Sequence, residues 1–308
     1  YCTDEQAIAI RRSADARLGR FLGGLTGLID PRKDLLIVLS PNARSFSDIE
    51  DEKMGGILVS GPGFRQGMLT SPSTRRPGVV TLADVAPTVL HFLGIGAPPE
   101  MVGRPMTATG RGSSAAALLA MNEQTSLQAQ RQPAMRGASV AQSVIVCLVM
   151  AAILFVSSAP VRTLASWLVT AVAGLPLTML YLPLVYSGGL VGTAVVLVVL
   201  TLALIGVCRL VFGSPARAFV WLCGAIVLSL MIDLLRGTPL MAASVAGYSI
   251  VEGARYYGIG NELMGTMMGA VIVGMGMVLA TRRLGPGVAG LLLAAVFAAV
   301  FAFIAAPR

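Results

Sequence analysis

Six long apolar runs occupy the second half of the chain. Each is long enough to cross about 30 Å of hydrocarbon as a helix, and each carries nearly all its charges at its ends. The runs cover residues 138–159, 164–185, 190–212, 217–235, 259–281 and 285–306. Small residues in the fifth run, GTMMGAVIVGMGMV, predict close packing against another helix. Six runs joined by short connections predict an all-α polytopic transmembrane domain of about six helices over 138–308.

The composition indicates that one part of the chain lies in water and another part in lipid. Of the 308 residues, 55% are hydrophobic and 12% are charged, and most acidic groups precede residue 137. The net charge of +8 comes from Arg scattered through loops, without a basic stripe interleaved with aromatic residues, so we expect no nucleic-acid partner. The chain opens at Tyr1 without an initiator Met or a secretory leader, and we interpret it as a fragment or a processed form.

Arginines in the connections between the runs predict an orientation. One set of connections carries Arg162, Arg209, Arg217, Arg282 and Arg283. The opposite set consists of the uncharged Tyr186–Gly189 turn and the 236–258 loop, where Glu252 offsets two arginines. Because Lys and Arg accumulate in cytoplasmic loops, the first set should be cytoplasmic. The sequence therefore predicts a multi-pass protein of the cell membrane with residues 1–137 outside the cytoplasm.

A cluster of polar groups flanks the start of the fifth run. Its candidate members are Asp233, Glu252, Arg255, Asn261 and Glu262. Ionisable groups at this depth are costly, which favours a polar cavity for a lipid head group, a sugar phosphate or a partner subunit. The simpler alternative is that Asn261 and Glu262 cap the following helix, while Asp233 pairs with Arg236. Both interpretations stay open.

The first half of the chain has a coarse α/β pattern. Helices are expected over about 4–28 and 82–93, and strands over 35–40 and 55–61. The second helix should be opened by Thr81 or Asp84 and closed by Gly94. The run at 35–40 lacks alternation, which fits a buried parallel strand. Helix and strand alternate, so the predicted class is α/β.

The segment after this domain is rich in Ala, Gln, Ser and Gly, with helical potential between Ser114 and Gln130. We interpret this segment as a stalk between the soluble domain and the membrane. The predicted organisation is therefore an α/β domain over 1–109, a linker over 110–137 and the transmembrane domain over 138–308.

The stretch VSGPGF…GMLTSPSTRRPGVVTLADVAPTVLHFLGIGAPPEMVGRPM resembles the C-terminal part of the alkaline phosphatase superfamily core. Sulfatases, phosphodiesterases, phosphopentomutases and lipid-head-group phosphotransferases share this core. The pieces that carry the resemblance are Asp84–Leu90 with Gly94-Ile95, and Met101–Pro105. The resemblance covers about residues 5–107 and implies a partial core. It also implies that Asp84 opens a structural helix with Pro87 in its first turn.

Two departures from that family concern its metals, which active relatives bind with Asp and His ligands beside a Ser, Thr or formylglycine nucleophile. Ser40-Pro41-Asn42-Ala43 stands where an Asp-His pair is expected, and TSPSTRRPG stands where a later His is expected. The sole histidine, His91, is expected to be a packing residue of the helix. We therefore predict no metal and no cofactor in this chain, and zinc or manganese only if ligands lie in a missing N-terminal part.

The TSPSTRRPG loop suggests a second kind of site. Two adjacent arginines beside several hydroxyls could hold a phosphate or sulfate without a metal. The candidate anion-binding residues are Ser71, Ser73, Thr74, Arg75 and Arg76. A solvated surface loop is the simpler alternative.

Three functions follow from these observations. The leading interpretation is a membrane-anchored alkaline phosphatase-like protein of the cell envelope, with a degenerate metal site and no catalysis by this chain. One alternative is a transport or assembly protein whose soluble domain binds an envelope ligand. The other is an active hydrolase or phosphotransferase completed by missing N-terminal residues. The expected partners are the lipid bilayer and an envelope lipid, glycan or phosphate-bearing ligand.

Overall fold

The computed structural model divides into two compact units, Tyr1–Ser126 (unit 1) and Leu127–Arg308 (unit 2). It describes residues 4–41, 54–110, 115–155, 158–186, 188–247, 250, 256, 258–281 and 286–305. The division falls inside the segment that the sequence predicts as a linker. There the chain forms helix α3 (Ala115–Phe155), which continues from one unit into the other.

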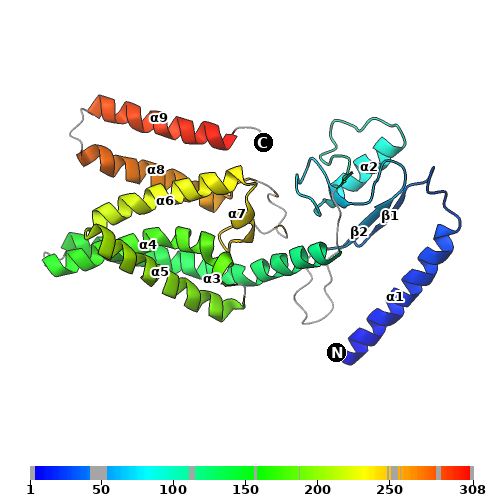
Figure 1. Cartoon of the computed structure of the whole chain (residues 1–308), viewed down its shortest axis with the longest axis horizontal. Coiled ribbons are helices and arrows are strands. Elements are labelled where there is room, and N and C mark those ends of the chain that lie inside the picture. Colours follow the sequence, from blue (N-terminus) through cyan, green and yellow to red (C-terminus); the bar gives the residue numbers. More distant parts are fainter. Residues whose placement is uncertain are drawn as a thin grey trace. The chain divides into compact units, whose positions relative to one another are not determined.

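Unit 1 combines helices with two small antiparallel sheets (Figure 1). Its elements in chain order are α1 (Asp4–Thr26), β1 (Leu36–Leu39), β2 (Ile57–Ser60), β3 (Met68–Thr70), the short 3-10 turn η1 (Leu82–Asp84), α2 (Val85–Phe92) and β4 (Thr107–Thr109). The predicted helices and the two predicted strands therefore form at the expected places. Strands β3 and β4 were not expected, because three-residue strands carry almost no periodicity.

The direction of the first strand pair differs from the prediction. Strand β1 runs antiparallel to β2, with Leu36 opposite Ser60 and Leu39 opposite Ile57, and β1 is half-buried. The expectation of a buried parallel strand is therefore wrong, because a short apolar run does not specify the direction of its partner. The sheets of the described residues are two-stranded, and a larger α/β core stays a prediction.

Helix α2 is fixed to the rest of unit 1 through its first turn, where Pro87 and Thr88 are buried. The Thr88 hydroxyl donates to the Asp84 carbonyl oxygen (2.6 Å) and accepts from the Met106 amide (2.9 Å). Gly94, with φ of +71°, ends the helix as predicted. His91 is exposed, so its expected packing role is wrong. The buried residues of α2 are Pro87 and Thr88, which lie in its first turn.

Unit 2 is an assembly of helices that lie side by side (Figure 1). After α3 come α4 (Ala159–Val185), α5 (Leu190–Phe212), α6 (Pro215–Leu235), the short α7 (Pro239–Ala243), α8 (Asn261–Thr281) and α9 (Pro286–Ala305). Helix α6 packs between α4 and α8, while α5 packs on α4 and α9 on α8. Helices α4 and α6 each begin with a proline in the first turn, where its fixed φ suits the helix.

Four of these helices are long and apolar enough to cross a membrane: α4, α5, α6 and residues Asn261–Ala280 of α8. The apolar parts found in the described residues of α3 and α9, Val140–Ala152 and Gly290–Ile304, are shorter. The helical content thus fits a membrane protein, and a count of six spans stays a prediction. Large aliphatic side chains of α5, such as Val191 and Leu210, are mostly exposed, which is compatible with contact to lipid.

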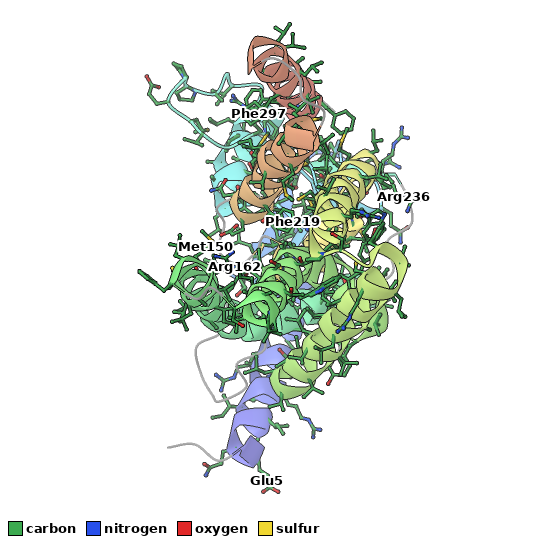
Figure 2. The ribbon with its side chains drawn as sticks, turned by 90° about the vertical axis from the view of Figure 1, so that its left-hand side faces the viewer. Glu5, Met150, Arg162, Phe219, Arg236 and Phe297 are labelled. Atoms are coloured by element: carbon green, nitrogen blue, oxygen red, sulfur yellow. The ribbon has the colours of Figure 1, made fainter. Side chains whose placement is uncertain are left out.

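The core of unit 2 lies where α4, α6 and α8 meet. Its most buried side chains are Leu180, Leu222, Leu230, Leu263 and Met267. Phe219 of α6 and Phe297 of α9 are partly buried against this core, whereas Arg236 projects from the end of α6 (Figure 2). Helices α6 and α8 approach closely at Gly274, where a Cβ atom would lie 2.7 Å from the Cβ of Cys223. The close approach at Gly274 agrees with the close packing predicted for the fifth apolar run, which forms α8.

Candidate functional site

A buried carboxylate organises the polar interior of unit 1. Asp84 is 0% exposed. Its Oδ1 accepts hydrogen bonds from the Ser73 hydroxyl (2.6 Å) and the Arg104 amide (2.9 Å). Its Oδ2 accepts from the Ser71 hydroxyl (2.7 Å) and the Thr81 amide (2.9 Å). A carboxylate has about four lone-pair sites, so these four donors saturate it.

The charge of Asp84 is stabilised by these bonds. Burial alone raises the pKa of the carboxyl, but the hydrogen bonds from Arg104, Ser73, Thr81 and Ser71 lower it, and the net pKa lies below its usual value. Asp84 is therefore ionised at neutral pH. An ionised carboxylate only accepts hydrogen bonds, so both serine hydroxyls must direct their protons toward it.

The hydroxyls of the predicted anion-binding loop are thus engaged inside the protein. Ser71 and Ser73 donate to Asp84, and the buried Thr74 hydroxyl donates to the Val79 carbonyl oxygen (2.7 Å). In this arrangement their protons cannot also be given to an anion. The remaining two of the five predicted anion-binding residues are Arg75 and Arg76.

The two arginines have different environments. Arg75 is exposed and has a φ of +51°, an uncommon backbone conformation for a residue with a side chain. Arg76 is half-buried, and burial lowers its pKa from the usual value. An Arg guanidinium stays charged even so, because its ordinary pKa is far above neutral. The loop therefore presents one exposed cation and one partly desolvated cation.

Arg104 is a further residue at this site that sequence reasoning missed. Its amide and the Ser73 hydroxyl share one oxygen of Asp84, so the fold brings Arg104 next to the loop that carries Arg75 and Arg76. A Cβ atom at the preceding Gly103 would overlap the carbonyl oxygen of Ala83, so only glycine permits this approach. The M-x-G-R-P motif marks Gly103 as a notable position. No local sequence pattern, however, indicates that Arg104 lies near the 71–76 loop.

The residues present do not fit the divalent metal site of the alkaline phosphatase superfamily. Ser40 and Pro41 directly follow β1, where the family has an Asp-His pair, and Asn42 and Ala43 lie outside the described residues. A hydroxyl and a proline are poor substitutes for carboxylate and imidazole. Asp84, the carboxylate nearest the 71–76 loop in the hydrogen-bond network, has no lone pair left for a metal.

The predicted membrane-face cluster is only partly described. Asp233, at the end of α6, is 1% exposed, and its two carboxylate oxygens accept the amides of Leu240 (2.9 Å) and Met241 (2.8 Å). The expected ion pair with Arg236 is wrong, because Asp233 instead caps the start of α7. Asn261 and Glu262 are exposed in the first turn of α8, where a carboxylate suits the helix dipole. Glu252 and Arg255 lie outside the described residues.

The segment after Asp233 folds back into unit 2. Met241, Ser244, Val245 and Ala246 are buried. The Ser244 hydroxyl donates to the Met179 carbonyl oxygen of α4 (2.9 Å) and accepts from the Ala246 amide (3.1 Å). We call residues 239–247 the re-entrant segment. Its first five residues form α7, whose start Asp233 caps, and Ser244 satisfies part of the non-helical backbone that follows.

Comparison with known proteins gives one short similarity. The chain is 56% identical over 36 residues to a 2,3-bisphosphoglycerate-independent phosphoglycerate mutase of Streptomyces coelicolor. The match covers 12% of this chain and 7% of that enzyme, so the chain spans a small part of its relative's length. That enzyme is a member of the alkaline phosphatase-like superfamily, so the short match gives partial support to the superfamily resemblance. No family model and no solved structure matches the chain.

Proposed function

We propose that this chain is a membrane-anchored, alkaline phosphatase-like protein of the cell envelope whose unit 1 works without the superfamily's metal-dependent reaction. The observation that carries the proposal is the closure of the 71–76 loop onto Asp84. Active relatives place a metal histidine in that loop. Here the loop hydroxyls and the carboxylate saturate one another, which makes the same region a structural support.

Two further observations support the proposal. Four helices of unit 2 can anchor the protein in a bilayer by length and composition. The similarity to a phosphoglycerate mutase is consistent with descent of part of the chain from a phosphate-handling superfamily. Fold does not imply function, so the loss of metal chemistry is argued from the residues of the loop and of the β1 end.

The test is metal content and phosphodiesterase activity of the purified chain in detergent. We expect substoichiometric zinc and manganese, and hydrolysis of bis(p-nitrophenyl) phosphate at the buffer rate, both for the native chain and for a variant with Arg75→Ala and Arg76→Ala. A metal-dependent phosphodiesterase in the same detergent serves as the positive control. Stoichiometric metal with turnover would contradict the proposal and favour an active enzyme completed by residues outside this chain.

A second candidate is a transport or assembly protein in which unit 2 does the work. The observation that favours it is the re-entrant segment, which is buried against α4 and α6. Discontinuous backbone inside a helical membrane unit is a feature of many transporters. In this alternative, unit 1 binds an envelope ligand and unit 2 acts on it.

The proposed orientation can be tested with a matched pair of cysteine variants. Ala97→Cys in unit 1 and Ala216→Cys in the first turn of α6, next to the α5–α6 connection, both lie at exposed positions. In a background with the four native cysteines replaced by alanine, an impermeant maleimide should label the unit 1 variant on intact cells. The Ala216→Cys variant should react only after permeabilisation, because its connection carries the arginines expected in the cytoplasm. The reverse pattern would show that the orientation is inverted.

A further inference from the structure

We infer that Arg76 and Arg104, with Arg75 beside them, form a metal-free binding site for the phosphate group of a monoester or diester. The inference rests on the proposed function, because it assigns a ligand class to a unit 1 that lacks the metal reaction. It differs from the sequence expectation in two respects. The loop hydroxyls do not bind the phosphate group. Arg104, from a distant part of the chain, does.

Asp84 joins the two chain segments that carry these arginines. Oδ1 of Asp84 lies 2.6 Å from the Ser73 hydroxyl and 2.9 Å from the Arg104 amide. Ser73 and Arg104 are therefore joined through a single oxygen atom, and Arg75 and Arg76 follow Ser73 closely in the chain. The Thr74 hydroxyl and the Gly78 amide, which donate to Val79 and Leu69, hold the loop in this conformation.

The charges around this point favour an anion. The four donors to the buried Asp84 carboxylate are two hydroxyls and two backbone amides, so Asp84 forms no hydrogen bond with the Arg76 guanidinium. Among the residues that the structure describes, no carboxylate forms an ion pair with Arg76, although its side chain is half-buried. A partly desolvated charge is costly unless it is paired, and a bound anion would supply that pair.

The chemistry of the donors selects phosphate. A guanidinium presents N–H donors in a planar fork that matches two oxygens of a phosphate, and two or three such forks suit a tetrahedral oxyanion. Arg75 is held at a φ of +51° by a loop that is anchored on both sides. Strained backbone of this kind gathers at ligand-binding sites, where the surrounding structure maintains it.

The first test is equilibrium dialysis of the full chain in detergent against radiolabelled inorganic phosphate. We expect saturable binding, weakened about tenfold by Arg76→Gln and Arg104→Gln together, because charge-assisted hydrogen bonds are lost. Arg20→Gln, a substitution of an exposed arginine of α1 in the same unit, is the matched control and should leave the affinity unchanged. Absence of saturable phosphate binding, or equal binding by the double variant, would overturn the inference unless the lipid arm below is positive.

The second test separates a soluble phosphate from a lipid head group. The rate at which phenylglyoxal modifies Arg76 and Arg104 is measured by mass spectrometry. The chain is placed in nanodiscs of phosphatidylglycerol or of phosphatidylcholine. Slower modification in phosphatidylglycerol alone would identify a lipid source, and slower modification only with added phosphate would identify a soluble source. Unchanged modification in every condition would refute the site. Metal-dependent turnover, in contrast, would refute the proposed function and leave anion binding to be decided by these two assays.

Discussion

Replacement of Asp84 by Asn is expected to lower the free energy of unfolding of unit 1 by about 3 kcal/mol or more, since hydrogen bonds to a charged group contribute about 1.5–3 kcal/mol each. The carboxylate accepts four hydrogen bonds, from Ser71, Ser73, Thr81 and Arg104. The Asn side chain has an NH2 group in place of one carboxylate oxygen. This group cannot accept hydrogen bonds, so some of the four buried donors lose their acceptor. Hydrogen exchange of the full chain in detergent, followed by mass spectrometry, measures the loss peptide by peptide.

The control for this experiment is Asp15→Asn, which changes an exposed carboxylate on α1 of the same unit. It should leave the exchange of residues 68–109 unchanged. Exchange of that region should accelerate in the Asp84 variant, whereas the helices of unit 2 should keep their protection, because the two units are separately compact. Equal exchange in both variants would mean that the Asp84 bonds contribute little to stability.

The same carboxylate gives unit 1 a defined acid sensitivity. Because the pKa of Asp84 is lowered in the folded state, its stabilising contribution is complete above the unfolded value of about 3.9 and is lost as the pH falls through the lower folded value. The stability difference between the native chain and the Asp84→Asn variant should therefore be constant near neutral pH and shrink below about pH 4.

The substitution Gly274→Ala is expected to destabilise unit 2 by about 1–3 kcal/mol, the usual cost of overpacking. The new Cβ would lie 2.7 Å from the Cβ of Cys223 and 3.4 Å from its sulfur, so α6 and α8 would have to separate. Helix propensity acts in the opposite direction, because Ala is favoured over Gly by about 1 kcal/mol in a helix interior. A lower midpoint of thermal unfolding in detergent would show that the steric effect dominates.

Gly276→Ala is the matched control, because the same change two residues later meets no atom within 4 Å. It should raise the midpoint or leave it unchanged. Cys223→Gly combined with Gly274→Ala removes the opposing Cβ and should recover part of the loss relative to Cys223→Gly alone. If both alanine variants behave alike, the close approach at Gly274 has no energetic importance.

Much of the helical architecture could be predicted from the sequence, because long apolar runs bounded by Pro, Gly and charges specify where helices begin and end. The predicted runs at 190–212 and 217–235 correspond to α5 (Leu190–Phe212) and α6 (Pro215–Leu235). The strand pairing was not predictable, because β1 and β2 are four residues each and apolarity alone does not encode direction.

The site was harder to predict than the helices, because its residues are joined by bonds that cross large sequence distances. Asp84 is recognisable as a helix-opening residue, but its bonds to Ser71 and Arg104 depend on the tertiary fold. Asp233 illustrates the same limit. Spacing favours a bond to Arg236, which is local in sequence, whereas the folded chain brings the amides of Leu240 and Met241 to the carboxylate.

The cap that Asp233 places on α7 has a consequence for how the protein is made. When the end of α6 emerges from the ribosome, the two amides that bind Asp233 have not yet been synthesised, and a buried carboxylate without hydrogen-bond partners is costly. The two amides that satisfy it belong to residues synthesised later, in the re-entrant segment. We therefore expect α6 and residues 239–241 to fold together, and a chimera or truncation that separates them would leave the Asp233 carboxylate without its two amide donors.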